Sequence, residues 1–142
     1  MLDMSCLHRR ASRVLPEALH TCALMDAPRD EAGLARWMLP LRHVPHGSLR
    51  FRLEEATAQA LLRDPWPCLA QAHHARQGLG PRAARLSYAD WERLATGTEP
   101  IYRSRSQDGR AVIWLLPSQR LLIYRWNDHP HATRERNMAW NC

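Results

Sequence analysis

The chain has 142 residues, a formal net charge of +6 at pH 7 and a pI of about 9.9. This length suits one domain that buries an adequate core without metal ions or disulfides. We therefore expect a single α+β domain over residues 1–142, with a flexible N-terminus of about 13 residues. No segment approaches the ~20 apolar residues of a membrane-spanning helix, and no apolar run follows the charges near the start, so we predict a cytoplasmic protein without membrane partners.

All twenty basic side chains are arginines, and lysine is absent. A guanidinium group can bind phosphate through two hydrogen bonds and can stack on a base, so this composition favours RNA or DNA as the partner. A GC-rich coding bias that replaces Lys by Arg throughout is the alternative explanation. The four cysteines lie far apart without a CxxC pair, and no nucleotide-binding, hydrolase or zinc-peptidase motif occurs, so we expect no metal, disulfide or cofactor.

The first half of the chain indicates short helices separated by prolines. Apolar spacing and proline positions predict helices over Glu17–Met25, from Asp30 to Pro40, over Glu54–Arg63 and over Pro67–Gln77. Leu49–Leu53 alternates apolar and basic residues, which predicts a strand. Ser87 and Asp90 form a capping-box pattern, which predicts a helix through Ala95.

The periodicity changes in the last third of the chain. Ile101–Ser106, Arg110–Leu116 and Leu121–Trp126 are rich in β-branched and aromatic residues and are separated by turn sequences. They predict an antiparallel meander over residues 101–126 with Arg110–Leu116 in the middle. The expected fold class is therefore α+β, with a helical N-terminal half and a C-terminal antiparallel sheet of about three to four strands.

Tight turns centred at 108–109 and 118–119 fix a register in which Trp114 lies between Arg103 and Ile123. One face of the meander is then apolar and available to the helices, and it carries Tyr102, Ala111, Ile113, Leu115, Leu122, Tyr124 and Trp126. The opposite face is basic around one indole ring. Its predicted nucleic-acid-binding residues are Arg103, Arg105, Arg110, Trp114 and Arg125, because guanidinium groups bind phosphates and the indole stacks on a base.

A structural role for this basic face is the alternative. Arginine stems would then cover Trp114, and the face would pack against the Leu49–Leu53 strand or a helix.

A second candidate site follows the last predicted strand. His129 and His131 could serve as an acid–base pair, with Arg134 or Arg125 stabilising the charge on a phosphate, which is the equipment of metal-independent RNA cleavage. Together with Asp128 the same imidazoles could bind a metal ion, and an inert tail is the third alternative.

In layout, the capped helix followed by a basic meander and a His/Arg-containing exit resembles the C-terminal half of RelE/ParE-type toxins. The resemblance covers about Ser87–Arg136 and includes no diagnostic motif. It implies a small basic ribonuclease or gyrase inhibitor.

Two function classes follow from these observations. The first is a small basic nucleic-acid-associated protein that cleaves RNA in the manner of a RelE-like toxin. The second is a non-catalytic interaction or inhibitor protein from a phage or mobile element, whose tryptophans serve the core and one surface for a protein partner.

Overall fold

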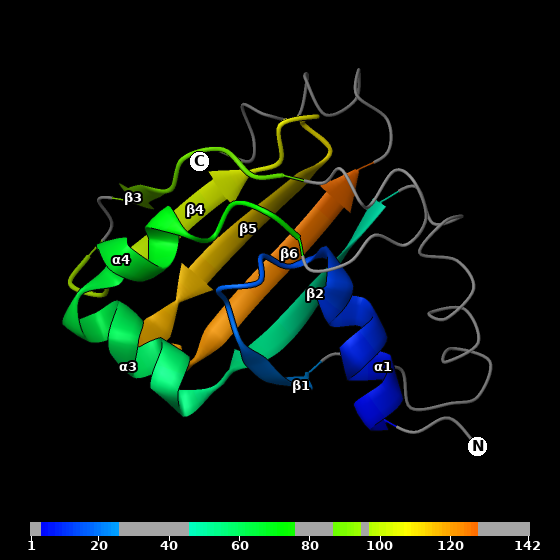
Figure 1. The fold of residues 1–142 in the computed structure, drawn as a ribbon, viewed down its shortest axis with the longest axis horizontal. Coiled ribbons are helices and arrows are strands. Elements are labelled where there is room, and N and C mark those ends of the chain that lie inside the picture. The colour runs from blue at the N-terminus through cyan, green and yellow to red at the C-terminus, as the bar shows by residue number, and fades with distance from the viewer. Residues whose placement is uncertain (1–3, 26–45, 76–86, 95–96, 128–142) are drawn as a thin grey trace.

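The computed structural model describes residues 4–25, 46–75, 87–94 and 97–127. The strands within these ranges form one antiparallel six-stranded sheet in the order β1-β2-β6-β5-β4-β3 (Figure 1). Their bounds are β1 Thr21–Leu24, β2 His46–Leu53, β3 Glu92–Leu94, β4 Ile101–Arg105, β5 Ala111–Leu116 and β6 Leu121–Asn127. The helices are α1 Met4–Ala11, α3 Glu55–Arg63 and α4 Pro65–Ala70, with 3₁₀ turns η1 at Ser12–Val14 and η3 at Pro117–Gln119.

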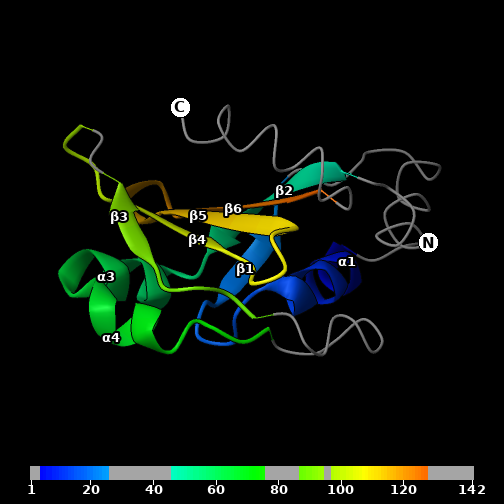
Figure 2. The same ribbon diagram turned by 90° about the horizontal axis from the view of Figure 1, so that it is seen from above.

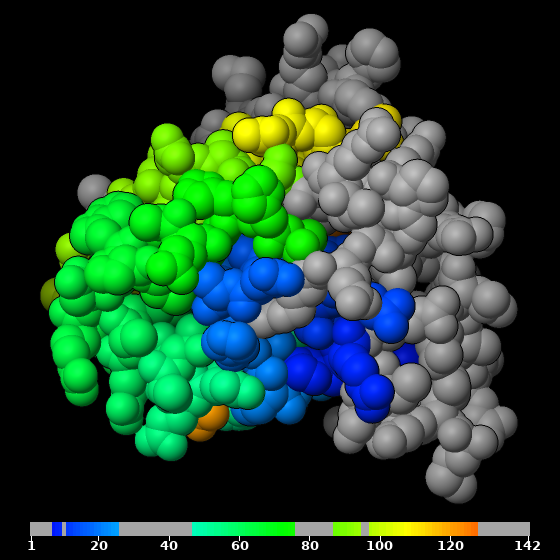
Figure 3. Space-filling model, viewed as in Figure 1, coloured from blue at the N-terminus to red at the C-terminus, as the bar shows by residue number. Residues whose placement is uncertain are grey.

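The helices α1, α3 and α4 all lie on one side of the sheet (Figure 2). In the space-filling view from that side, α3, α4 and the N-terminal segment lie in front of the strands (Figure 3). The core lies between the two layers, and its sheet side includes Leu49, Phe51, Tyr102, Ile113, Leu115, Leu122 and Tyr124. The sheet therefore has one face that packs on helices and one face that no described helix covers.

The expected division into a helical N-terminal half and a C-terminal sheet is wrong. Strands are spread along the whole described chain, and the helices are few and short. The predicted meander is the β4-β5-β6 part of a larger sheet, which β2 and β1 extend on one side and β3 on the other. The long-range pairing of β2 with β6 is the feature that the sequence pattern did not reveal.

The helix expected over Glu17–Met25 is not formed. Thr21–Leu24 pairs with β2 instead, with an irregular register between Thr21 and Ala23. Leu19 is fully buried without a helix, since a turn places it in the core through a hydrogen bond from its N–H to Pro16 O (3.1 Å). β-Branched Thr21 has a low helix propensity, and pairing with β2 supplies the backbone hydrogen bonds that a helix would have made.

The prediction of a helix from Ser87 onwards is also wrong. Ser87 Oγ donates to Gln107 Oε1 at 2.8 Å instead of capping a helix, and Glu92–Leu94 pairs with β4 as β3. Trp91 lies in the core, where its Nε1 donates to Ala72 O at 2.8 Å. Pairing with the free backbone groups at the edge of β4 stabilises a strand here more than the capping pattern stabilises a helix, because local helix propensity is only a weak preference.

Other predictions for the first half have mixed outcomes. The strand at Leu49–Leu53 and the helix at Glu54–Arg63 are confirmed as parts of β2 and α3. The helix expected over Pro67–Gln77 begins earlier and is shorter, because α4 spans Pro65–Ala70. The helix expected from Asp30 to Pro40 lies outside the described residues.

The predicted meander and its register are confirmed. Trp114 pairs with Arg103 and with Ile123, and the expected middle strand Arg110–Leu116 is interior strand β5, which begins one residue later at Ala111. The first hairpin loop is closed by a hydrogen bond from Gly109 N–H to Ser106 O (3.0 Å), with Gly109 at a φ of 74°. Glycine suits this left-handed position because it has no Cβ.

We predict that Gly47→Ala destabilises the sheet where β2 meets β6. A Cβ on Gly47 would lie 2.6 Å from Cη2 and Cζ2 of Trp126, whose ring stacks on Tyr124 with centroids 5.8 Å apart. Relieving this overlap should cost about 1–3 kcal/mol of unfolding free energy, measured by urea denaturation. Ser48→Ala, at an exposed neighbouring position, serves as the control. Unchanged stability of Gly47→Ala would show that Trp126 can move aside.

We predict that Tyr88 makes the protein less stable at high pH. The Tyr88 hydroxyl donates to Val14 O at 2.6 Å, and burial, followed by the charges of Tyr124 and Asp108, raises the pKa of Tyr88 well above its usual range. Because the fold favours the protonated phenol, this stability is complete below the unfolded pKa of about 10 and is lost as the pH rises above it.

The test compares Tyr88→Phe with the unmodified chain by urea unfolding at about pH 8 and about pH 11. The substitution should cost about 1–3 kcal/mol at the lower pH, because Val14 O loses its buried donor. The variant should also lose less stability than the unmodified chain between the two pH values. An identical loss in both proteins would contradict the assignment to Tyr88.

Candidate functional site

The sheet face opposite the helices carries arginines from three strands. The pairing of β2 with β6 places Arg50 beside Ile123 and Arg52 beside Leu121, on the same side of the sheet as the basic face of the meander. We call this surface the arginine face and define it by Arg50, Arg52, Arg103, Arg105, Trp114, Ile123 and Arg125. Its cations come from segments more than fifty residues apart in the chain.

Trp114 lies at the centre of the arginine face. Arg103 on β4 and Ile123 on β6 are its direct cross-strand neighbours. The guanidinium of Arg125 lies 5.3 Å from the centroid of the Trp114 ring, within the range of a cation–π interaction. The indole is half-buried, so it combines a partly accessible ring with a cationic stacking partner.

Arg103 is oriented by a carboxylate from the neighbouring strand. Its Nε donates to Glu92 Oε1 at 2.7 Å, and its Nη2 lies 2.5 Å from the same oxygen. The Arg103 side chain is 14% exposed and that of Glu92 is 55% exposed. A pair this close to solvent contributes at most about 1 kcal/mol to stability, so its main effect is to fix the direction of the guanidinium.

Accessibility varies across the arginine face. The arginines on β2 and β6 are exposed, those on β4 are half-buried, and Val112 between Arg105 and Arg125 is 1% exposed. Arg50, Arg103, Arg105 and Arg125 all take part in polar or ring interactions. An anionic ligand would therefore exchange existing contacts for new ones, and it would reach the β2 and β6 side of the face most easily.

The structure brings together four of the five predicted nucleic-acid-binding residues, which are Arg103, Arg105, Trp114 and Arg125. Arg110 lies in the hairpin loop just before β5, where its N–H donates to the Asp108 carboxylate at 3.0 Å. The structure adds Arg50, Arg52 and Glu92, which the sequence analysis did not include. The predicted acid–base residues His129, His131 and Arg134 lie outside the described residues.

Among the residues that the structure describes, the structural alternative for the basic face is realised in one respect. Arg125 does lie over Trp114, as an arginine that covers an indole would. However, the Leu49–Leu53 strand pairs with β6 within the sheet and does not pack across the face. The strand expected to cover the arginines instead contributes two more.

Other chemistry receives little support from the described residues. Burial raises the pKa of the Cys68 thiol, which disfavours the thiolate that a nucleophilic cysteine requires. Within residues 4–25, 46–75, 87–94 and 97–127, no three His, Cys, Asp or Glu side chains are arranged to hold a metal ion. In the same ranges, every helix is too short or too polar to traverse a lipid bilayer.

No protein-family model, no curated protein and no solved structure matches this chain. The RelE/ParE-like layout also depended on a capped helix beginning at Ser87, and the structure has β3 in that region. The features of this chain that bear on function are therefore the geometry and charge of the arginine face.

Proposed function

We propose that this protein binds single-stranded nucleic acid on the arginine face. The observation that carries the proposal is the gathering of five arginines around Trp114 on one side of the sheet, with the described helices on the other side. Together with the net charge of +6, this arrangement gives one face of the molecule a positive potential that attracts polyanions.

Arginine and tryptophan supply complementary contacts to a nucleic acid. Guanidinium groups bind phosphate oxygens with two parallel hydrogen bonds, and the counterions that they displace drive association at low salt. Trp114 and the guanidinium of Arg125 offer adjacent flat surfaces for a base, and each stacked base is worth about 1–3 kcal/mol.

A single strand fits this surface better than a duplex. Trp114 sits within the sheet and is half-buried, so only a base that leaves its own stack can lie against the ring. In a duplex the bases stay stacked on one another, and the contacts would be limited to arginine and phosphate. RNA cleavage by His129, His131 and Arg134 stays a prediction from the sequence.

One observation favours a protein partner as the second candidate. A row of half-buried apolar side chains crosses the end of the same face, formed by Leu94, Ile101, Leu116 and Leu121. Apolar patches with a charged rim are typical of protein interfaces. Such a partner would need carboxylates to meet Arg52 and Arg103.

We predict that the protein binds a fluorescein-labelled oligouridine of about eight nucleotides, measured by fluorescence anisotropy. If three arginines contact phosphate, the logarithm of the association constant should fall with the logarithm of salt concentration with a slope of about −2. Arg103→Ala, Arg105→Ala and Arg125→Ala should each reduce this slope by about 0.7. Trp114→Ala should weaken the single strand more than a duplex of the same length, because stacking is lost only from the single strand.

The matched control is the triple variant Arg9→Ala, Arg63→Ala and Arg93→Ala. These exposed arginines lie on α1, α3 and β3, and the one on β3, Arg93, pairs with Tyr102, a residue of the core-facing side of the sheet. The variant therefore loses the same charge from outside the arginine face. Equal loss of affinity in this control and in a variant that combines Arg103→Ala, Arg105→Ala and Arg125→Ala would mean that binding follows net charge alone. Absence of binding by the unmodified chain would favour the protein-partner candidate.

A further inference from the structure

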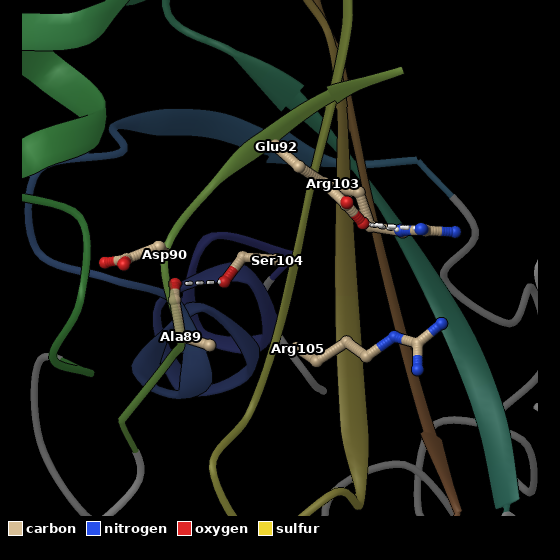
Figure 4. A pocket seen from close by; sticks show the side chains of 6 residues that line it. All are labelled: Ala89, Asp90, Glu92, Arg103, Ser104 and Arg105. Atoms are coloured by element: carbon tan, nitrogen blue, oxygen red, sulfur yellow. Dashed lines mark hydrogen bonds and ion pairs between the residues drawn. The ribbon is translucent and has the colours of Figure 1, made fainter. Parts of the chain in front are cut away.

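A hollow of about 400 Å³ adjoins the arginine face at the β3 edge of the sheet (Figure 4). It is lined by Ala89, Asp90, Glu92, Arg103, Ser104 and Arg105. Two of these residues, Arg103 and Arg105, also belong to the arginine face. A strand bound across that face would therefore pass the mouth of the hollow.

An irregularity in strand pairing lies at this hollow. Tyr88 forms a bridge with Ser106, whereas Glu92 pairs with Arg103, so the segment leading into β3 has one residue more than the facing part of β4. The extra residue is a β-bulge, a feature that often re-aims side chains at sheet edges. Trp91 turns into the core within this bulge.

The walls of the hollow are held by short hydrogen bonds. Ala89 N–H donates to Arg105 O at 2.8 Å, and Ser104 Oγ donates to Ala89 O at 2.6 Å. Figure 4 shows Arg103 and Arg105 extending to the same side of β4, with the Glu92 carboxylate beside Arg103. The side chains that would meet a ligand thus project from a fixed backbone.

The hollow brings hydrogen-bond acceptors and hydrogen-bond donors together in one place. A guanidinium only donates hydrogen bonds and a carboxylate only accepts them. Both contacts between Arg103 and Glu92 use Oε1, and among the described residues no hydrogen bond reaches Glu92 Oε2. A ligand can therefore donate to Glu92 Oε2 while it accepts from Arg105 in exchange for the contacts that Arg105 already makes.

We infer that this hollow selects guanine from a single strand bound on the arginine face, an inference that rests on the proposed function. The N1–H and N2–H groups of guanine are two adjacent donors that match a carboxylate, and O6 and N7 are acceptors that match an arginine fork. In this assignment Glu92 accepts from N1–H and N2–H, and Arg105 donates to the O6 and N7 side.

The other bases lack this combination. Adenine and cytosine place a ring-nitrogen acceptor beside the amino group, and that acceptor would face the carboxylate. Uracil has one N–H between two carbonyl oxygens. Inosine keeps N1–H and O6 but lacks the 2-amino group, so it tests the Glu92 contact alone.

The experiment measures anisotropy with oligouridines of about eight nucleotides that carry one central guanosine, inosine or adenosine. We expect the guanosine strand to bind roughly 5- to 100-fold more tightly than the adenosine strand, with inosine between them. Glu92→Gln should reduce the guanosine-to-adenosine ratio several-fold, because the amide replaces one acceptor with a donor, whereas Arg105 keeps its contact with the O6 side.

Glu99→Gln is the matched control. It removes the same charge from an exposed carboxylate that bonds Gln119 outside the hollow, so the ratio should keep its original value. Thermal unfolding of Glu92→Gln checks that the variant folds, and its midpoint should stay close to that of the unmodified chain.

Equal affinity for the guanosine, inosine and adenosine strands would overturn the inference while leaving the proposed function intact, provided that all three bind with steep salt dependence. A guanosine-to-adenosine ratio that Glu92→Gln leaves unchanged would remove Glu92 from the site and overturn the assignment. Failure of every strand to bind would overturn the proposed function and the inference together.

Discussion

The pairing of β2 with β6 is the interaction on which the rest of the structure depends. It runs from His46 opposite Asn127 to Arg52 opposite Leu121, and it joins the N-terminal half of the chain to the C-terminal meander. On the helix side it places Leu49 and Phe51 in the core. On the opposite side it places Arg50 and Arg52 on the same face of the sheet as the arginines of β4 and β6. One register thus determines both the core and the candidate site.

This register is constrained on both faces. Leu49 and Phe51 are 1% and 0% exposed, and a shift by one residue would bring Arg50 and Arg52 into the core. Buried guanidinium groups without partners are strongly unfavourable, so the alternation of apolar and basic residues in β2 admits only one orientation. Gly47 adds a second constraint, since only a residue without a side chain fits beneath the Trp126 ring.

The stability of the fold and the proposed binding are separable in this arrangement. The core consists of aliphatic and aromatic side chains on one face, whereas the arginines on β2 and β6 are exposed on the other. Exposed charges contribute little to the free energy of unfolding but act at long range on a polyanion. Substitutions on the arginine face can therefore change affinity while the fold persists.

The meander could be predicted from the sequence because its signals are local. β-Branched strands, Asp108-Gly109 and a four-residue loop after Leu116 fix the pairing of Trp114 with Arg103 and with Ile123, and hence most of the arginine face. Arg50 and Arg52 could not be assigned to the site, because the contact between β2 and β6 spans about seventy intervening residues and no local pattern encodes it.

The errors in the first half have a common physical cause. Leu15 and Leu19 have helical spacing, yet both are buried in turns, and the capping pattern at Ser87 is overridden by pairing with β4. Short apolar segments fit a helix or a strand equally well until their packing partners are known. Glu92 was missed for this reason, since its position beside Arg103 exists only when β3 is a strand.

The most direct measurement of the central claim is the location of a bound strand on the protein. Oligouridine carrying 5-bromouridine can be crosslinked by ultraviolet light and the modified residues identified by mass spectrometry. If the strand binds on the arginine face, the crosslinks should concentrate at Trp114 and its neighbours on β4, β5 and β6. Crosslinks confined to α1, α3 and α4 would contradict it, because these helices lie on the other side of the sheet.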